Sequence, residues 1–437
     1  MSTKEEFKKI LSLSKLFKGI SYKGVNLDKV QSKDIREIVT EDTKIRRWLM
    51  VFLLLPLKID GNIKKARVMY SVFDQNPSHI KFADLAMKQV KDKAEIKIQY
   101  NKIRPDIPRP RHFVFSIKNI LFNKKIRLNI KYRIYLTLRT AMYVNYIDYC
   151  ISLIGNKKLD MYISMYGGAG FSEAILNQLL TANNKDIALS CFQHGLVAAS
   201  TPTDRFINYE TTADYIFCWG EYNRDGIKRS NKTDKKLIIC GNPLYSNRKK
   251  KSYNFKKRRK LVTIFLDPAQ SPRLQSNIGM LKLVLPVLIK NGFEYQLKLH
   301  PGRQSTIKPF QNHFAEKLVF VNKPAEKMIE ESYFCISTSS TVFAEGTFYG
   351  VPFLRYRAPE KSIPFYRMDP INNIFDDKKS FEKLLHKLMD EKEYQKRCKE
   401  MWSYADYYFS YCDKDVSEVY AKTIKKIIDK KPENRKI

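Results

Sequence analysis

The sequence predicts an α/β protein made of two doubly wound domains with a cleft between them. Short apolar runs rich in β-favouring residues alternate with segments of helical composition along most of the chain. Polar or glycine-rich loops follow those runs, at the points where parallel strands would end. A run of nearly pure charge at residues 248–260 separates the pattern into two halves, so we expect a parallel sheet in each half.

The composition is that of a folded and strongly basic protein. Its 437 residues are enough for two domains with sizeable cores, and 43% of them are hydrophobic, which excludes a disordered chain. The formal net charge of +35 indicates attraction to an anionic partner such as nucleic acid, a membrane face or a charged polymer. The seven cysteines form no C-x-x-C pair, which argues against a disulfide framework or a zinc site and favours a reducing cytoplasm.

No part of the sequence predicts a membrane span. The chain opens with charged residues at positions 4–6, and we expect no cleavable leader. The strongest apolar run, residues 48–57, is broken by Pro56 and is far shorter than the roughly 20 residues that a spanning helix needs. We interpret it as a buried strand or helix, with a membrane-surface element as the alternative.

The first domain is expected at residues 61–247, after a basic helical segment at residues 1–60. A strand at 67–73 leads into a polar loop that begins with Asp74, and a helix at 80–91 follows. Ligands of doubly wound domains gather at the carboxyl ends of the strands. Asp74 therefore lies where a site would be, although a loop of this composition is also an ordinary turn.

Two later loops of this domain have the composition of a ligand site. One strand is followed by Gly167 and Gly168, which let the backbone approach a ligand at the start of a helix. Another strand ends in Gln193-His194-Gly195. A histidine at the tip of a buried strand titrates near neutrality and suits a general base, while a purely structural histidine is the alternative.

Residues 107–147 contain no acidic residue. Lysines and arginines are interleaved there with Phe, Leu, Ile and Tyr, and a long helix at 129–153 is expected to close the segment. Such a mixture suits a membrane-surface face or a groove for an acidic polymer, and a solvated helix face is the plainest alternative. We favour the membrane surface.

The basic run at 248–260 is expected to be the linker to a second domain at residues 261–395. Helices at 396–437 follow it, and their aromatic residues indicate that they pack back on the first domain. One strand of the second domain ends in His300-Pro301, with Arg303 close behind, at the edge of the sheet where ligands bind.

The stretch at 331–355 has the pattern strand, hydroxyl-rich turn, helix and strand. Ser339, Ser340 and Thr341 lie in the turn, and Gly350 ends the expected helix. Free backbone N–H groups, the helix dipole and the hydroxyls make such a turn a phosphate site. Glu345, one turn into the helix, is placed to accept bonds from a ribose. An ordinary capped helix is the alternative interpretation.

Two doubly wound, Rossmann-like halves with a cleft between them resemble a GT-B glycosyltransferase. The motifs Gln193-His194-Gly195, Gly241-Asn242-Pro243, His300-Pro301 and Ser339-Ser340 carry the resemblance, in this order, over roughly residues 160–355. They are similar to motifs of two groups. One is the bacterial sialyl-, polysialyl- and Kdo transferases that use CMP-sugars, and the other is the CDP-glycerol glycerophosphotransferases of teichoic-acid synthesis.

The resemblance implies roles for several residues. In the first group the His-Pro histidine and the paired serines hold the CMP phosphate, which implies that role for His300, Ser339 and Ser340. That group places an acidic residue before a glycine as base, whereas Gln193-His194-Gly195 looks more like the Trp-His-Gly of the second group, whose histidine serves the acceptor. Glu345 resembles the ribose-binding glutamate of GT-B enzymes.

The implied reaction needs a nucleotide-sugar donor and no metal or other cofactor. Charge that develops on the leaving phosphate is stabilised by cations, hydroxyls and a helix N-terminus. We expect His194 to be the acceptor-side base, with Glu173 and Asp74 as alternatives. The residues expected to bind the donor are Gly167, Gly168, His300, Pro301, Arg303, Ser339, Ser340, Thr341 and Glu345.

The expected function is transfer of a CMP-linked 2-keto acid sugar, such as Kdo or sialic acid, to a capsule, O-antigen or lipopolysaccharide acceptor. The expected partners are the donor, a glycan or glycolipid acceptor and the anionic inner face of the cytoplasmic membrane, where the protein would be peripheral. A CDP-glycerol-type glycerophosphotransferase is the nearer alternative. A non-enzymatic basic protein that binds nucleic acid is the more distant one, and we expect no nucleic acid because no recognisable binding module is present.

Overall fold

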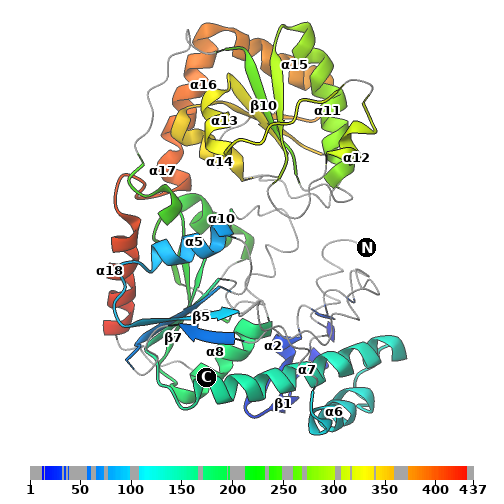
Figure 1. Cartoon of the computed structure of the whole chain (residues 1–437), viewed down its shortest axis with the longest axis vertical. Helices are drawn as coiled ribbons and strands as arrows, with labels where there is room; N and C mark the ends of the chain where they lie inside the picture. Colours follow the sequence, from blue (N-terminus) through cyan, green and yellow to red (C-terminus); the bar gives the residue numbers. More distant parts are fainter. Residues whose placement is uncertain are drawn as a thin grey trace.

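The computed structural model consists of two α/β units arranged one above the other along the long axis of the molecule (Figure 1). It describes residues 12–13, 15–31, 34–35, 38, 57–60, 65–72, 77–98, 108–165, 171–193, 195–196, 212–231, 236–248, 259–267, 273–300, 307–314, 317–338, 341–358 and 373–430. The predicted class, α/β with two doubly wound sheets, is confirmed.

Among the described residues, seven strands form the first sheet, in the order β3-β5-β4-β6-β7-β8-β9. β3 runs antiparallel to β5 at one edge, and the other neighbours are parallel. The strands are β3 (Leu57–Asp60), β4 (Val68–Ser71), β5 (Lys93–Ile98), β6 (Met161–Ser164), β7 (Ala188–Phe192), β8 (Tyr215–Cys218) and β9 (Lys236–Ile239). Strand order reverses between β4 and β6, which is therefore the topological switch point of this unit.

Helices cover both faces of the first sheet because successive residues of a strand point to opposite sides. Met69 packs with α7 and α8 on one face, whereas Val68 and Tyr70 pack with α5 and α18 on the other. These helices are α5 (Pro77–Ala86), α7 (Ile130–Ile154), α8 (Phe171–Asn183) and α18 (Val416–Asp429), and α10 (Glu221–Asn231) packs beside β8 and β9. The long helix predicted at 129–153 is confirmed as α7.

The described part of the first 60 residues includes strands as well as helical turns, and the helical segment expected at 1–60 as a whole remains a prediction. It contains a hairpin, β1 (Ser21–Tyr22) and β2 (Val25–Asn26), before the short helix α2 (Leu27–Val30), and it ends with β3. Lys23 and Gly24 both have positive φ, as a two-residue hairpin turn requires. Leu57–Asp60 alternates apolar and polar residues, which is the period of an edge strand. Most of the apolar run at 48–57 lies outside the described residues.

The second sheet has five strands within the described ranges, in the order β11-β10-β12-β13-β14, and all neighbours are parallel. The strands are β10 (Leu261–Phe265), β11 (Glu294–Lys298), β12 (Phe334–Ser337), β13 (Phe353–Tyr356) and β14 (Ile374–Phe375). The helices of this unit are α11 (Arg273–Lys290), α12 (Lys308–Gln311), α13 (Ala325–Glu331), α14 (Val342–Glu345), α15 (Lys378–Met389) and α16 (Glu391–Ser403), with the 3-10 turn η6 at Gly346–Tyr349. Its switch point lies between β10 and β12.

The chain returns to the first unit after α16. It passes through α17 (Ala405–Tyr408) into α18, and the Ser410 amide donates to the Trp219 carbonyl at 2.9 Å. Gly241 makes the close approach possible, because a Cβ there would lie 2.5 Å from the Ser410 carbonyl oxygen and its φ is +87°. The domain limits predicted at 61–247 and 261–395 remain predictions, although the described chain passes from the first sheet to the second between β9 and β10.

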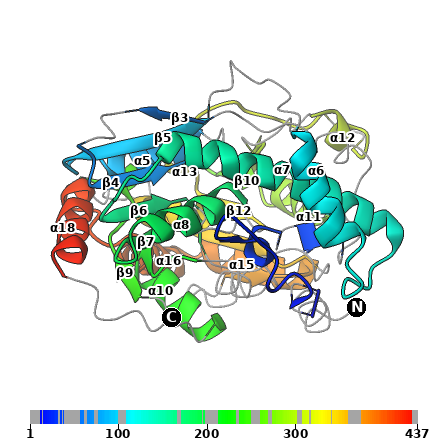
Figure 2. The same cartoon turned by 90° about the horizontal axis from the view of Figure 1, so that it is seen from below.

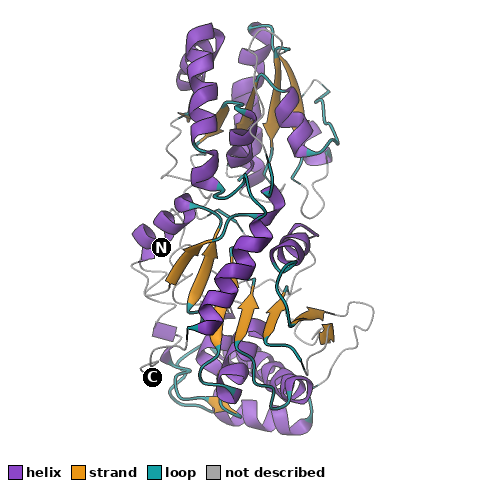
Figure 3. Cartoon of the chain, turned by 90° about the vertical axis from the view of Figure 1, so that its left-hand side faces the viewer, coloured by secondary structure: helices purple, strands orange, loops and turns teal. Residues whose placement is uncertain are grey.

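The carboxyl edges of the two sheets face each other. Figure 3 shows the strand arrows of the lower unit pointing up and those of the upper unit pointing down. An apolar cluster also joins the units, because Tyr222 of α10 packs with Phe343 of α14 and Tyr408 of α17. Within the described ranges, every helix is either too short or too polar to cross a membrane.

Candidate functional site

The switch point of the second sheet is held together by buried polar side chains. Asp267 lies just beyond β10 and Thr338 just beyond β12, and the Thr338 hydroxyl donates to the Asp267 carboxylate. Asn277 of α11 completes the arrangement, since its side-chain amide donates to the Asp267 carbonyl at 2.9 Å and accepts from the Asp267 amide at 3.2 Å. Two loops are therefore tied to one helix at the point where ligands of this fold bind.

Sequence reasoning did not select Asp267, Asn277 or Thr338 as site residues. An aspartate directly after a predicted strand was the available signal, but the loop that follows it had the composition of an ordinary turn. The partner residues are 10 and 71 positions away in the sequence, so no local pattern joins them.

The hydroxyl-rich turn leads into a shorter helix than the sequence predicts. α14 is one turn long and continues as the 3-10 turn η6, in which the Thr347 hydroxyl donates to the Ala344 carbonyl at 2.5 Å. Thr341 is the N-cap residue but its side chain makes no capping bond, because its backbone is already helical. Gly350 ends the segment with φ +56°, as predicted. A single α-helical turn has a weaker dipole than the expected two turns.

The predicted phosphate ligands fall mostly outside the described residues. Ser339 and Ser340 lie outside them, between Thr338 and Thr341, and so do Pro301 and Arg303. His300 is described: it is half-buried and lies two residues beyond β11, which borders β10. Because β11, β10 and β12 are parallel neighbours, His300 lies at the same edge of the sheet as Asp267 and Thr338.

Glu345 lies where the second unit meets the first. It is half-buried at the end of α14, and its carboxylate accepts a hydrogen bond from the Tyr245 hydroxyl of the 3-10 turn η4 (Pro243–Tyr245), which follows the Gly-Asn-Pro motif. Burial is the main cause that raises the pKa of Glu345 to about 7; the nearby Glu326 contributes in the same direction, while Tyr245 and Arg248 oppose the shift. Glu345 is therefore poised to change protonation near neutral pH.

Arg248 links the two units beside this carboxyl group. Its guanidinium lies over the rings of Tyr245, Phe348 and Tyr349, at 5.1, 5.4 and 5.6 Å from their centroids. It also pairs with Glu326 of α13 at 2.5 Å. Arg248 begins the run of charge that the sequence predicts to be the linker, and no sequence motif singles out Tyr245.

The switch point of the first sheet is also fixed by polar contacts. Ser71 of β4 and Tyr162 of β6 share a hydrogen bond of 2.5 Å between their hydroxyl groups. Glu173 of α8 is buried, and its carboxylate accepts from the Met165 amide at 3.0 Å, just where the glycine-rich loop begins. Gly167 and Gly168 lie in that loop, outside the described residues, and Asp74 also lies outside them.

The backbone on both sides of His194 is well anchored, although His194 itself lies outside the described residues. The Gln193 side-chain oxygen accepts from the Trp219 amide at 2.7 Å, and its amide nitrogen donates to the Gly195 carbonyl at 2.7 Å. Asn223 of α10 also donates to that carbonyl at 3.3 Å. The glutamine before the histidine therefore fixes the loop at the carboxyl end of β7.

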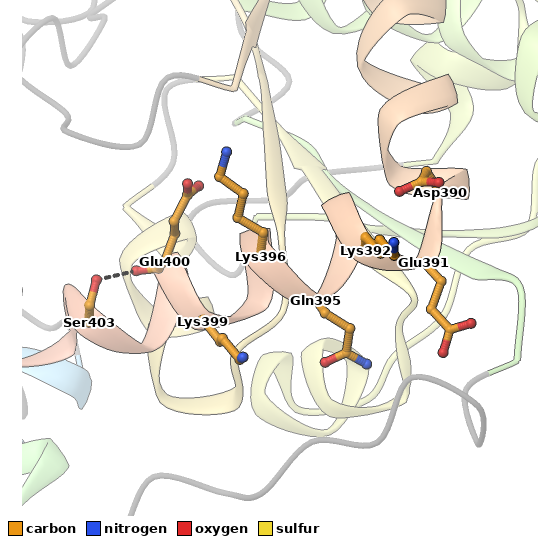
Figure 4. Close-up of a pocket in the computed structure, with 8 residues that line it drawn as sticks. All are labelled: Asp390, Glu391, Lys392, Gln395, Lys396, Lys399, Glu400 and Ser403. Carbon is orange, nitrogen blue, oxygen red and sulfur yellow. Dashed lines mark hydrogen bonds between the residues drawn. The ribbon is translucent and has the colours of Figure 1, made fainter.

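One pocket among the described residues lies away from both switch points. It has a volume of about 1180 Å³ and lies along α16 and the residue before it. Figure 4 shows that its side chains spread along the helix surface and do not converge on a common point. The residues that line it are Asp390, Glu391, Lys392, Gln395, Lys396, Lys399, Glu400 and Ser403. It has the alternating charges of a solvated helix face.

Among the described residues, no cluster of three or more His, Cys, Asp or Glu side chains has the arrangement of a metal site. One Asp-x-Asp triplet, Asp413-Lys414-Asp415, is present in the sequence. Asp415 is the N-cap of α18, and its carboxylate accepts from the Ser417 amide at 2.9 Å, so its position is explained by the helix it caps.

Solved structures share this architecture. A protein from Listeria monocytogenes assigned as a UDP-N-acetylglucosamine 2-epimerase superposes with a TM-score of 0.51 at 15% identity, over 85% of this chain and 100% of that one. A structure of S. aureus MnaA with UDP superposes with a TM-score of 0.50 at 14% identity, over 84% of this chain and 100% of that one. No family model matches the sequence, and no curated protein matches it.

At these identities the likeness shows the fold. The chain has a GT-B-type fold, with two Rossmann-like α/β units whose strands end toward each other, as the sequence predicts.

Proposed function

We propose that this protein is a glycosyltransferase that moves a sugar from a nucleotide donor to an acceptor of a bacterial surface polysaccharide. The observation that carries the proposal is Glu345, whose carboxyl group is held at the end of the one-turn helix α14 that follows β12, at the edge that meets the first unit. A carboxylate at that position suits the hydroxyl groups of a ribose. Both solved structures reported above are named for UDP or for an enzyme of a UDP-sugar, which supports a nucleotide-sugar ligand.

The second unit is the proposed donor site. Asp267 and Thr338 tie together the two strand ends of the switch point. We propose that Ser339 and Ser340, which follow Thr338 in the sequence, supply hydroxyl and amide groups to the nucleotide phosphate. His300, from the neighbouring strand, supplies an imidazole at the same edge. The proposed donor ligands of this unit are His300, Pro301, Arg303, Ser339, Ser340, Thr341 and Glu345. The glycine-rich loop with Gly167 and Gly168 would approach the donor from the first unit.

The first unit is the proposed acceptor site. Gln193 anchors the backbone around His194, and we propose that His194 is the general base. Glu173 is a less suitable base because its carboxylate is buried and already accepts a backbone amide, which favours a role in positioning the glycine-rich loop. Asp74 is the remaining alternative.

The reaction that these groups support is a direct displacement without a metal ion. The base removes the proton of an acceptor hydroxyl, and the oxygen bonds to the anomeric carbon of the sugar as the bond from that carbon to the phosphate oxygen breaks. The electron pair leaves with the nucleotide phosphate. Hydroxyl groups, backbone amides and the His300 imidazole stabilise the new charge, and His300 can return a proton to it.

We propose the nucleotide and the transferred group of the donor from the sequence motifs. The His-Pro and paired-serine motifs favour a CMP-linked 2-keto acid sugar, such as Kdo or sialic acid, for a capsule, O-antigen or lipopolysaccharide acceptor. Gln193-His194-Gly195 favours the alternative of a CDP-glycerol-type glycerophosphotransferase. The similar structure of S. aureus MnaA contains UDP, so a UDP-sugar is a third donor to test. A glycolipid acceptor would place the protein at the inner face of the cytoplasmic membrane.

Thermal-shift measurements with CMP, CDP, UDP and GDP test the proposal. Ligand at 100 times its dissociation constant adds about 2.7 kcal/mol to the free energy of unfolding, which is a clear rise in Tm. We expect one pyrimidine nucleotide to stabilise the wild-type protein, and the Glu345→Gln variant to be stabilised less. If no nucleotide changes the Tm while short duplex DNA or RNA does, the nucleic-acid-binding alternative is correct and the enzyme proposal fails.

A further inference from the structure

A helical hairpin projects from the first unit, away from both switch points. It consists of α6 (Pro110–Ser116), the π-helical turn η3 (Ile117–Leu121), the loop after it and the first turns of α7, and we call residues 109–134 the basic hairpin. Figures 1 and 2 both show α6 and the start of α7 at the outer edge of the molecule. The loop is well held, because the Arg133 guanidinium donates to the Leu121 and Asn123 carbonyls.

The inner side of the basic hairpin is fixed by a cluster of side chains around the partly buried carboxylate of Asp148. His112 is fully buried, its Nδ1 accepts from the Arg109 amide at 3.1 Å, and its Nε2 lies 3.0 Å from the Asp148 carboxylate. Lys23 of the N-terminal hairpin and Arg111 pair with the same carboxylate, at 2.7 and 2.5 Å. The orientation of α6 is therefore set by its buried side, and its outer face is a defined surface.

The outer face exposes large apolar side chains. His112, Ser116 and Ile120 are buried at four-residue spacing, so Val114 and Phe122 fall on the opposite side of the helix. Val114 is 66% exposed and Phe122 is 72% exposed. Across the loop, Ile130 and Ile134 of α7 are 61% and 43% exposed. The other exposed large apolar side chains of the described residues are dispersed over the chain: Ile80, Ile289, Ile307, Val319, Met389 and Tyr411.

The charge around these apolar side chains has a single sign. No acidic residue occurs between residues 107 and 147. Exposed basic side chains that take part in none of the ion pairs of the described residues are Lys118, Lys124, Lys125, Arg127 and Lys131. Lys118 lies midway between Val114 and Phe122 on the same face, and Lys131 is next to Ile130. Apolar and positive groups are therefore mixed on one surface.

We propose that the basic hairpin docks this protein on an anionic lipid bilayer, with Phe122 and Ile130 entering the headgroup region and the lysines contacting lipid phosphates. An interfacial element needs apolar side chains that reach below the headgroups and basic ones that stay at their level, and this surface has both. Aliphatic side chains such as Val114 and Ile134 offer no stacking surface to nucleic-acid bases, which favour aromatic rings and arginine. A surface without acidic residues is also unlike the mixed rim of a protein interface.

The inference deepens the proposed function, because a glycolipid acceptor would lie in this bilayer. It rests on the proposed function only for the identity of that acceptor. It narrows the membrane-surface face expected at residues 107–147 to one structured element of the first unit, the basic hairpin. It can also be tested without donor or acceptor. A protein that binds vesicles but no nucleotide would leave this inference standing and would defeat the proposed function.

Co-sedimentation of the whole chain with lipid vesicles tests the inference. Vesicles of phosphatidylcholine with phosphatidylglycerol are compared with vesicles of phosphatidylcholine alone, at low and at high salt. We expect binding to the anionic vesicles, weakened by salt. Lys124→Glu with Lys125→Glu should weaken it at least about tenfold, because each basic residue near such a surface contributes about fivefold to binding. Phe122→Ser with Ile130→Ser should weaken it by a similar factor even at low salt.

Matched control variants are available on the second unit. Lys392→Glu with Lys396→Glu changes the same charge on the surface of α16, and Ile289→Ser removes an apolar side chain that is 52% exposed on α11. Both controls should bind vesicles like the wild type. Phe122→Trp supplies a direct probe, since the fluorescence of the added indole should shift to the blue and be quenched by brominated lipid on binding.

Three outcomes would overturn the inference. One is that the wild-type protein does not bind anionic vesicles. Another is that the hairpin variants bind as tightly as the controls. The third is that the fluorescence of the Phe122→Trp variant responds to a soluble acidic polymer but not to vesicles, which would identify the surface as a groove for such a polymer. Melting curves of each variant show whether its fold is intact.

Discussion

Replacement of Glu345 by glutamine separates the charge of this side chain from its shape. Glutamine keeps nearly the same volume and an acceptor oxygen, but it cannot ionise. If the Glu345 carboxylate accepts bonds from the ribose of the donor, the variant exchanges charged hydrogen bonds for neutral ones. Bonds to a charged group contribute about 1.5–3 kcal/mol and neutral ones about 0.5–1.5 kcal/mol. We expect the nucleotide Kd to rise by about five- to thirtyfold.

The pH dependence of binding gives an independent check. Burial raises the pKa of Glu345 to about 7, so the side chain is a carboxylate above that pH and a neutral acid below it. Wild-type affinity for the nucleotide should therefore fall as the pH drops through about 7. The decrease approaches about tenfold per pH unit until the affinity of the neutral form is reached. Glu345→Gln should show no such step.

The same pKa shift predicts an effect on stability. The pKa of Glu345 is higher in the folded protein, at about 7, than its usual value of 4.5, so folding favours the protonated form. The stabilisation is therefore complete below the unfolded pKa and is lost as the pH rises toward 7. We expect the free energy of unfolding to lose about 3 kcal/mol over that window in the wild type, and Glu345→Gln to lack this loss.

Calorimetric titration with the stabilising nucleotide, from about pH 5 to about pH 8, measures these quantities. Glu326→Gln is the matched control, because Glu326 lies at the same interface but is half exposed and pairs with Arg248. It should leave the Kd above about pH 7 nearly unchanged and move the pH step toward lower pH without removing it, because Glu326 raises the pKa of Glu345. Equal Kd values for the wild type and Glu345→Gln, or a pH step that persists in the variant, would refute a ribose contact by Glu345.

Other substitutions test the catalytic and structural roles separately. His194→Ala should bind its nucleotide normally but transfer about 10²–10⁴-fold more slowly, and a parallel loss of affinity would move His194 to the donor site or to the fold. His300→Ala should lower turnover about 10²-fold, and near-normal turnover at saturating donor would remove it from the mechanism. Gly241→Ala should cost about 3 kcal/mol of unfolding free energy, because its Cβ would lie 2.5 Å from the Ser410 carbonyl at φ +87°, and denaturant unfolding that shows no loss would contradict this packing. Thr338→Val removes a donor to the buried Asp267 carboxylate and should cost about 1–3 kcal/mol in the same assay, with Thr341→Val as the control.

The structural features of this protein that could be predicted are those that depend on short stretches of sequence. Apolar runs between polar loops predict the strands of both sheets, because burial on both faces selects β-branched and aromatic residues. The position of Glu345 after a strand and a hydroxyl-rich turn was predictable for the same reason. Gly350 was also predictable as a stop, because few other residues adopt the left-handed backbone at a helix end.

The features that sequence reasoning missed depend on contacts between distant residues. The Tyr245 hydroxyl meets Glu345 only because the two units dock with their strand ends facing each other. Arg248 begins a run of basic residues, and no local pattern distinguishes this arginine, which stacks on three rings, from the other basic residues of the run. The edge strand at Leu57–Asp60 was missed because its alternation lasts four residues and follows a longer apolar run.

The direct test of the account is ³¹P NMR of the purified protein incubated with CMP-linked and UDP-linked sugars, with and without a glycan acceptor. The account predicts that one donor is consumed and that its free nucleotide appears, faster with acceptor than without it, while the sugar is recovered on the acceptor. Conversion of a donor into an isomeric sugar nucleotide with no release of nucleotide would contradict transfer and identify an epimerase. Donors that all remain unchanged, together with the absence of nucleotide binding, would contradict the enzyme assignment itself.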